Sequence, residues 1–267
     1  MPRLFSALVL AALLAGCAAT APVAPAPASA DGRDVTFTIL HFNDVYEITP
    51  VEGGRSGGLA RVATLRQRLL AESPNVITVI AGDFFSPSAL GTARVDGARL
   101  NGRQMVAVLN AVGVDVAALG NHEFDVPEAD FRARLTESRF PYVSANVSPA
   151  AGAAPFPNVV PSLVLPVVVG PGDTLRVGVV SAVLPSNPKP FVVYGPTVES
   201  VAEETARLDP VTDVVVALTH LAFDEDATVA ATVPGVDLVL GGHEHENVRA
   251  YRGPAFVPVL KADANVR

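Results

Sequence analysis

The sequence contains little cysteine, little basic charge and no apolar run long enough to cross a membrane. A single cysteine among 267 residues excludes a disulfide framework and any structural zinc site built on cysteines. Lys and Arg total 19 against 27 Asp and Glu, and the net charge of −8 argues against a nucleic-acid polymer as partner, since phosphate backbones bind to basic surfaces. Charged residues still make up 17% of the chain and hydrophobic residues 49%, so we expect a folded core.

The N-terminus has the pattern of a bacterial lipoprotein signal. Arg3 precedes an apolar stretch over residues 4–15 that is too short to span a bilayer, and the sequence LAGC that ends in Cys17 resembles a lipobox. We predict a signal peptide over residues 1–16, lipidation of Cys17, and an extended Ala/Pro-rich tether over residues 17–33. The alternative is an ordinary signal peptide with an incidental cysteine. Either way the protein is expected to be exported; the lipid would anchor it to the cell envelope, on the outer membrane of a two-membrane host.

Residues 34–267 alternate short β-branched runs with amphipathic stretches. This alternation predicts an α/β fold with strands buried on both faces. Helices are predicted over residues 59–72, 102–113, 127–138 and 198–208, the first with Leu59, Val62, Leu65, Leu69 and Leu70 on one face. Strands are predicted over 35–42, 75–83, 114–118, 140–147, a hairpin about 170–173, 212–220, 236–242 and 255–261. The abrupt stop after the last strand suggests a fragment, or a protein that has lost a downstream domain.

Polar side chains gather at the carboxyl ends of these strands. Ligands of open α/β sheets bind at such ends, so the side chains there are expected to meet in one crevice. Gly82, Gly120 and Gly242 precede the polar residues and would let the backbone turn sharply. One histidine at a strand end is more often structural than functional, but here Asp, Asn and several His offer the mixed oxygen and nitrogen donors that suit Mn²⁺, Zn²⁺ or Fe. All five histidines of the chain lie in these segments: His41, His122, His220, His243 and His245.

The order of these segments (GD, GNHE, a strand-final His, then GHEH) resembles that of the calcineurin-like metallophosphoesterases. GNHEFD with SANV downstream is similar to the catalytic domain of the secreted bacterial 5′-nucleotidase family, and the match runs from about Val35 to Val259. The resemblance implies a four-layer α-β-β-α sandwich with two divalent metal ions (Mn, Zn, Fe or Co). It further implies hydrolysis of phosphomonoesters, above all nucleotides, by a metal-bridged hydroxide outside the cytoplasm.

The resemblance also implies a role for each site residue. His122, hydrogen-bonded to Asp125, would form the catalytic pair that faces the phosphate, stabilising charge or protonating the leaving group. The implied metal ligands are Asp83 as the bridge, Asp44 and His245 at the first metal, and Asn121, His220 and His243 at the second.

Two departures from the family pattern affect these expectations. The family motif Asp-x-His is here Asp44-Val45-Tyr46, so Tyr46 would ligate the first metal, line the pocket or do neither. His41 is expected to pack within its strand or to support a ligand, with direct ligation as the alternative. The second departure is that this sequence does not include the C-terminal domain that family members use to bind phosphates and bases. Without it, nucleotide selectivity is not expected from this chain.

Two other functions compete with a 5′-nucleotidase-like hydrolase. One is a catalytically weakened surface lipoprotein or binding module of the same fold, which Tyr46 and the shortened chain favour. The other is a different hydrolase of the same fold, a cyclic-nucleotide phosphodiesterase or a thiosulfate-ester hydrolase, which the site motifs cannot separate from a nucleotidase. The intact GNHEFD and GHEH segments favour an enzyme, because drift would erode metal ligands first.

Overall fold

Two β-sheets form the framework of the part of the chain that the structure, a computed structural model, describes: residues 34–170 and 172–267. The first sheet has the order β1-β2-β5-β6-β8 and all its strands are parallel. Its strands are β1 (Thr38–Phe42), β2 (Val76–Ala81), β5 (Val116–Ala118), β6 (Tyr142–Val143) and β8 (Val159–Val160). The predicted signal peptide, Cys17 and almost all of the tether lie outside the described residues.

The second sheet has the order β14-β15-β13-β12-β10-β9, with parallel strands at its centre and an antiparallel strand at each edge. Its strands are β9 (Ser162–Gly170), β10 (Asp173–Val180), β12 (Val214–Thr219), β13 (Leu238–Gly241), β14 (Val248–Arg252) and β15 (Val257–Lys261). Two small pairs complete the strands: β3 (Arg94–Val95) with β4 (Ala98–Arg99), and β7 (Val147–Pro149) with β11 (Val192–Tyr194).

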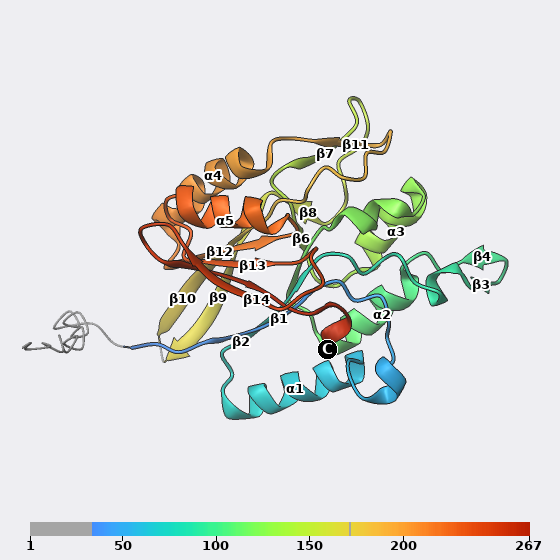
Figure 1. The fold of residues 1–267 in the computed structure, drawn as a ribbon, viewed down its shortest axis with the longest axis horizontal. Coiled ribbons are helices and arrows are strands. Elements are labelled where there is room, and N and C mark those ends of the chain that lie inside the picture. Colours follow the sequence, from blue (N-terminus) through green and yellow to red (C-terminus); the bar gives the residue numbers. More distant parts are fainter. Residues whose placement is uncertain (1–33, 171) are drawn as a thin grey trace, which may run out of the picture. The chain divides into compact units, whose positions relative to one another are not determined.

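Helices cover the outer face of each sheet (Figure 1). The first sheet carries α1 (Leu59–Glu72), α2 (Arg103–Val112) and α3 (Glu128–Glu137), and the second carries α4 (Thr197–Leu208) and α5 (Phe223–Thr232). Short 3-10 turns span Glu52–Gly54, Leu90–Thr92, Asn121–Asp125, Asp209–Val211 and Ala264–Val266. This mixed α/β arrangement of helix, sheet, sheet and helix confirms the predicted sandwich. No helix within the described residues combines the length and the apolar character needed to cross a bilayer.

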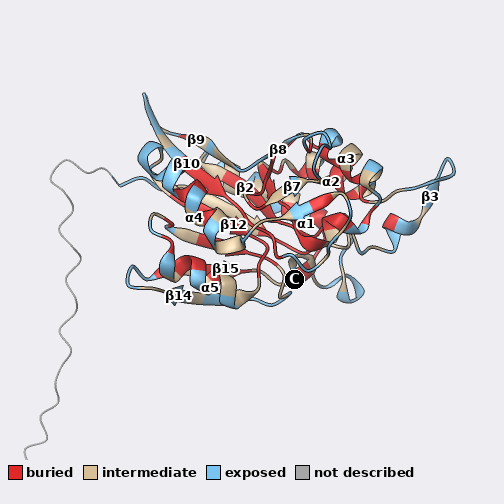
Figure 2. Ribbon diagram, turned by 90° about the horizontal axis from the view of Figure 1, so that it is seen from above, coloured by how far each residue is buried: buried red, intermediate tan, exposed pale blue. Residues whose placement is uncertain are grey.

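The inner faces of the two sheets pack directly against each other. Val79 and Val116 of the first sheet belong to the same buried apolar cluster as Val179, Val216 and Leu218 of the second. The strands are therefore buried on both faces, which accounts for their continuous runs of β-branched residues. Figure 2 shows this buried layer in red, with exposed residues on the outer helices and hairpins. The contact fixes how the two sheets lie relative to each other, and so where their strand ends meet.

Most predicted elements form, with local exceptions. Residues 59–72 are helical as predicted, but Leu65 is 45% exposed, so its placement on the buried face was wrong. Successive helical residues turn by about 100°, which puts Leu65 about 120° from Leu59 and at the edge of the apolar stripe. The predicted strand over 140–147 shortens to two residues, because Ala145 already donates to the carbonyl of Ser181 in the other sheet's strand–loop region. Helix α5 and the β3–β4 hairpin were not predicted.

Candidate metal centre

The carboxyl ends of strands from both sheets meet at one place, as the sequence predicted. The polar side chains leave the backbone within three residues of a strand end. Asp44 follows β1, Asp83 follows β2 and Asn121 follows β5, while His220 follows β12 and His243 follows β13.

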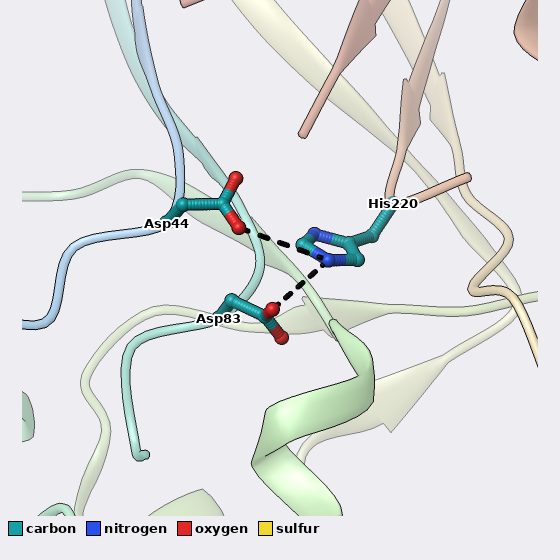
Figure 3. Close-up of side chains that lie close together, drawn as sticks. All are labelled: Asp44, Asp83 and His220. Atoms are coloured by element: carbon teal, nitrogen blue, oxygen red, sulfur yellow. Dashed lines mark ion pairs between the residues drawn. The ribbon is translucent and has the colours of Figure 1, made fainter. Parts of the chain in front are cut away.

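Three buried side chains form the centre of this cluster (Figure 3). Suitable ligand atoms of Asp44, Asp83 and His220 all lie within 4.8 Å of one another. Nε2 of His220 is 3.1 Å from Oδ2 of Asp83 and 4.0 Å from Oδ1 of Asp44. Metal–ligand bonds are about 2.0–2.2 Å for oxygen and nitrogen donors, so small adjustments would let these atoms bind divalent ions lying between them.

Two buried atoms test whether a metal fits this place. Oδ1 of Asn121 is buried and has no hydrogen-bond partner among the described residues, and the buried Nε2 of His220 forms no well-directed hydrogen bond although it lies close to Asp83. Buried polar atoms are nearly always satisfied, and a cation would satisfy both. The other ring nitrogen of His220, Nδ1, lies 2.7 Å from the carbonyl oxygen of Ala81, to which it donates. Metal-binding imidazoles are usually fixed in this way, so the residues present fit a divalent ion.

The electrostatic field of the cluster also favours a cation. Burial of His220 disfavours its charged form, but the carboxylates of Asp83 and Asp44 outweigh this and raise the pKa of His220 to about 10. Burial likewise opposes ionisation of Asp83, yet the adjacent His220 and the hydrogen bond from the His122 amide lower the pKa of that carboxyl. Asp83 is therefore an anion even where it is buried.

The GHEH loop brings two further histidines to Asp44. The backbone N–H of His243 donates to Oδ2 of Asp44 at 2.9 Å, and its ring centroid lies 5.5 Å from that of His220. Nε2 of His245 lies 3.1 Å from Oδ1 of Asp44, with its side chain 48% exposed. The structure thus brings together five of the six residues predicted as metal ligands. The sixth, Asn121, directly precedes His122, whose backbone N–H donates to Oδ1 of Asp83 at 2.8 Å.

Tyr46 lies among the ligands predicted for the first metal. Its hydroxyl oxygen is 3.1 Å from Oδ1 of Asp44, 3.3 Å from Oδ2 of Asp83 and 3.0 Å from Nε2 of His245. Burial and the negative charges of Asp83 and Asp44 raise the pKa of the Tyr46 phenol. The position that holds an imidazole in the family pattern therefore holds a neutral hydroxyl here.

His122 is not part of this cluster and is paired instead with Asp125. Its Nδ1 lies 2.7 Å from Oδ2 of Asp125, and its ring is 37% exposed. Burial opposes its charged form, but the hydrogen bond to Asp125 and the charge of Asp83 raise the pKa of His122. The other oxygen of Asp125 accepts a 2.7 Å hydrogen bond from Nδ2 of Asn187, a residue that sequence reasoning did not find. Asn187 thus holds the His122–Asp125 pair in place, and the pair is accessible to solvent.

Glu123 ties together two of the loops that carry these residues. Its buried carboxylate accepts hydrogen bonds from the backbone N–H groups of Asp83 (2.8 Å), Phe84 (2.7 Å), Phe85 (3.1 Å) and Gly120 (2.6 Å). Burial and the nearby charge of Asp83 raise the pKa of Glu123 to about 7. The GNHE segment contained the only sequence signal for this role, and the role was missed.

Lys261 makes the corresponding tie in the second sheet. Its buried Nζ donates to the carbonyls of Leu221 (2.7 Å) and Gly242 (2.9 Å), which adjoin His220 and His243 in sequence. It also forms ion pairs with Asp226 and Glu244. Sequence reasoning did not single out this residue, because nothing near it in the sequence marks a site.

The loops approach one another so closely that glycine is required. A Cβ at Gly120 would lie 2.2 Å from Oδ1 of Asp83, and one at Gly242 would lie 2.4 Å from the carbonyl oxygen of Ala81. Of the three glycines singled out by sequence, only Gly82 has a positive φ, 77°. Four of the candidate ligands, in contrast, have left-handed backbone conformations, which are typical of functional sites. The φ values are 52° for Asp44, 59° for Asp83, 88° for His243 and 62° for His245.

His41 lies in β1, where it is in register with Val79 of β2. Burial lowers the pKa of its ring to about 4, although the backbone of Gly241 acts in the opposite direction. Its Nε2 is buried without a hydrogen-bond partner among the described residues. This placement corresponds to the expectation that His41 packs within its strand.

Together the fold and the site define a two-sheet α/β protein with a candidate metal centre at its strand ends. A sequence model of the calcineurin-like phosphoesterases matches residues 37–247. The chain belongs to this family, whose members are hydrolases that use divalent metals.

Several proteins similar to this chain are 5′-nucleotidases. A snake venom 5′-nucleotidase of Gloydius brevicauda is 34% identical over 224 residues, which are 78% of this chain and 36% of the venom protein. The 5′-nucleotidase of Homo sapiens is 33% identical over 226 residues, which are 78% of this chain and 38% of the human protein. The crystal structure of a 5′-nucleotidase precursor from Thermus thermophilus superimposes with a TM-score of 0.70 at 26% identity, covering 84% of this chain and 48% of that one. The chain therefore spans less than half the length of these relatives.

Proposed function

We propose that this protein is a divalent-metal-dependent phosphomonoesterase whose substrates are nucleotides. One observation carries the proposal: the buried Asp44–Asp83–His220 cluster, with an unsatisfied Asn121 oxygen, lies next to the His122–Asp125 pair. The likeness to 5′-nucleotidases supports nucleotides as the substrate class.

Six residues would hold two metal ions. Asp83 would belong to both ligand sets, since it contacts His220 of the second set and the Tyr46 hydroxyl, which lies among the ligands of the first. When bound, the two ions would activate a water molecule as the hydroxide nucleophile and neutralise charge on the phosphoryl group. The first set comprises Asp44, Asp83 and His245, and the second comprises Asp83, Asn121, His220 and His243.

His122 would act on the leaving group, on the side of the phosphoryl group opposite to the attacking water. Its Nδ1 is bonded to Asp125, so Nε2 is the nitrogen free to meet substrate. The hydrogen bond to Asp125 favours the protonated ring, so His122 would supply a proton to the oxygen that leaves. Asn187 holds Asp125, which in turn orients the ring, and this chain of contacts prepares the pair before substrate binds.

The test is a substrate panel with the purified protein after removal of metal and reloading with Mn²⁺, Zn²⁺ or Co²⁺. Nucleoside 5′-monophosphates and p-nitrophenyl phosphate should be hydrolysed only with metal present. Faster hydrolysis of cyclic nucleotides and bis-p-nitrophenyl phosphate would instead favour the phosphodiesterase. Two bound equivalents of metal without turnover of any ester would identify the weakened binding module, which Tyr46 at the first metal favours.

We further propose that the protein is exported and lipid-anchored through Cys17. The lipobox-like LAGC and the Ala/Pro-rich stretch that follows support this. A single acyl chain anchors poorly, so stable attachment assumes the several chains of bacterial lipoproteins. Cys17→Ser should release the protein from the membrane fraction or leave it unprocessed, and unchanged fractionation would refute the anchor.

A further inference from the structure

A pocket of about 460 Å³ adjoins the catalytic pair. Asp125 forms part of its wall, and the rest comes from the loop after Asp83, from Glu47 and from Arg99 at the base of the β3–β4 hairpin. This hairpin extends away from the body of the fold (Figure 1). The pocket is large enough for a nucleoside-sized group, since ligand sites typically measure 300–1,000 Å³.

Arg99 carries an unneutralised positive charge at this pocket. Its side chain is exposed and forms no hydrogen bond or ion pair with any residue that the structure describes. Arg94 is its direct cross-strand partner in the β3–β4 pair, and Arg94 donates only to the carbonyl of Gly97, at 2.6 Å. Like charges facing each other across strands destabilise a hairpin. An anion bound at Arg99 would remove that cost.

Glu47 supplies a free acceptor in the same pocket. Its backbone N–H is bonded to Asn265, but its carboxylate has no partner among the described residues. A free carboxylate accepts hydrogen bonds from hydroxyl groups, so the pocket offers one group for an anion and one for alcohols. This combination suits a sugar that bears a phosphate.

The position of the pocket relative to His122 decides which part of a substrate would enter it. In the hydrolysis, the oxygen of water bonds to phosphorus, the bond from phosphorus to the ester oxygen breaks, and a proton passes from His122 to that departing oxygen. The leaving group must therefore lie on the side of His122 and Asp125. Asp125 bonds the His122 ring and also lines the pocket, so the pocket lies on that side.

We infer that this pocket is a leaving-group subsite for a hydroxylated moiety that carries a second phosphate, held by Arg99. The inference rests on the proposed phosphomonoesterase function and narrows its substrate class to bisphosphates of nucleosides or sugars. One phosphate is hydrolysed at the metal centre and the other stays on the product.

The experiment compares adenosine 3′,5′-bisphosphate with adenosine 5′-monophosphate in the parent protein, Arg99→Met and Arg103→Met. Arg103 is an exposed arginine of α2 that does not line the pocket, which makes it the matched control. A hydrogen-bonded charge pair contributes about 1.5–3 kcal/mol. The ratio of kcat/KM for the bisphosphate over the monophosphate should therefore fall about 10–100-fold in Arg99→Met and stay at the parent value in Arg103→Met.

Calorimetric binding of adenosine 3′-monophosphate, the product that retains the second phosphate, gives a readout independent of turnover. Arg99→Met should weaken this binding by a similar factor, and adenosine should bind the parent and the variant alike. Equal losses for both substrates, or unchanged product binding, would overturn the subsite. Absence of phosphomonoester hydrolysis by the parent protein would refute the proposed function instead, while the product-binding result would still decide the subsite.

Discussion

At the residue scale, hydrogen bonds to groups outside the ligand cluster determine which atom of each side chain is available to a metal or a substrate. His220 uses Nδ1 on a backbone carbonyl, so that Nε2 is left for a cation. His122 follows Asn121 directly, yet its ring pairs with Asp125 while the Asn121 oxygen stays unsatisfied. Adjacent residues can therefore serve different purposes, one at the metal and one at the substrate.

Replacement of His122 should separate catalysis from metal binding. We expect His122→Ala to lower turnover by about 10²–10⁴-fold, the usual contribution of a general acid–base group, with little change in metal content or substrate affinity. Asp83→Asn, in contrast, should lose metal and activity together. Steady-state kinetics and metal analysis of both variants check this, and a metal site emptied by His122→Ala would contradict the division of roles.

Replacement of Tyr46 should strengthen the first metal site. A neutral phenol is a poorer ligand than an imidazole, so we expect the parent protein to bind its first metal more weakly than its second. Tyr46→His should tighten the weaker site, because it restores the Asp-x-His pattern next to Asp44 and His245. Titration calorimetry with Mn²⁺ or Zn²⁺ measures both affinities. Two equal affinities that the substitution leaves unchanged would show that no ligand is missing.

At the element scale, two buried charged groups join loops that are distant in sequence. Glu123 links the loop after β2 to the loop after β5, and Lys261 on β15 links the loops after β12 and β13. Each holds backbone groups rather than a metal. These hydrogen bonds offset the energetic cost of the left-handed backbone conformations that four of the candidate ligands adopt.

Removal of the Lys261 ammonium should destabilise the second sheet's loops. Burial raises the pKa of Asp226 to about 6, although Lys261 acts against this, so the loss of Lys261 leaves a buried carboxylate without its counter-charge. We expect Lys261→Met to lower the free energy of unfolding by about 3–5 kcal/mol. Urea denaturation measures this, and Asp226→Asn in the same background should recover part of the loss. Lys189→Met, at the only other lysine, should change stability by about 0.5 kcal/mol or less.

At the scale of the whole molecule, the candidate metal centre is built from residues of both sheets. Asp44, Asp83 and Asn121 come from the first sheet, and His220, His243 and His245 come from the second. A bound ion would therefore connect the two halves of the sandwich, and the folded state would bind it far better than the unfolded chain.

Metal removal should therefore lower thermal stability. At a metal concentration about 100-fold above the Kd, binding contributes about 2.7 kcal/mol, which corresponds to a rise in Tm of about 5–10 °C for a domain of this size. Thermal unfolding followed by circular dichroism, with chelator and with added Mn²⁺, measures the shift. Asp83→Asn should show a much smaller shift, and an equal shift in that variant would place the stabilising ion elsewhere.

The sequence by itself determined the alternation of strands and helices and the identity of the polar residues at strand ends. Both are local properties: β-branched runs and 3.6-residue periodicity set the elements, and the segments GD, GNHEFD and GHEH, with Asp44 and the strand-final His220, marked the six candidate ligands. The predictions that failed also concern local features. Leu65 fitted the apolar stripe only loosely, and the two-residue strands of the β3–β4 hairpin are too short to leave a pattern.

Only the tertiary structure decided how these local features combine. The placement of Tyr46 against Asp44, Asp83 and His245 depends on two loops that are nearly 200 residues apart in sequence meeting in space. The supporting roles of Glu123, Asn187 and Lys261 arise from long-range hydrogen bonds to backbone groups, and no short motif encodes such contacts. The pocket at Arg99 forms because a hairpin and three loops lie side by side. Packing of one sheet on the other brings Asp44 and Tyr46 against His245, since it sets where the strand ends meet.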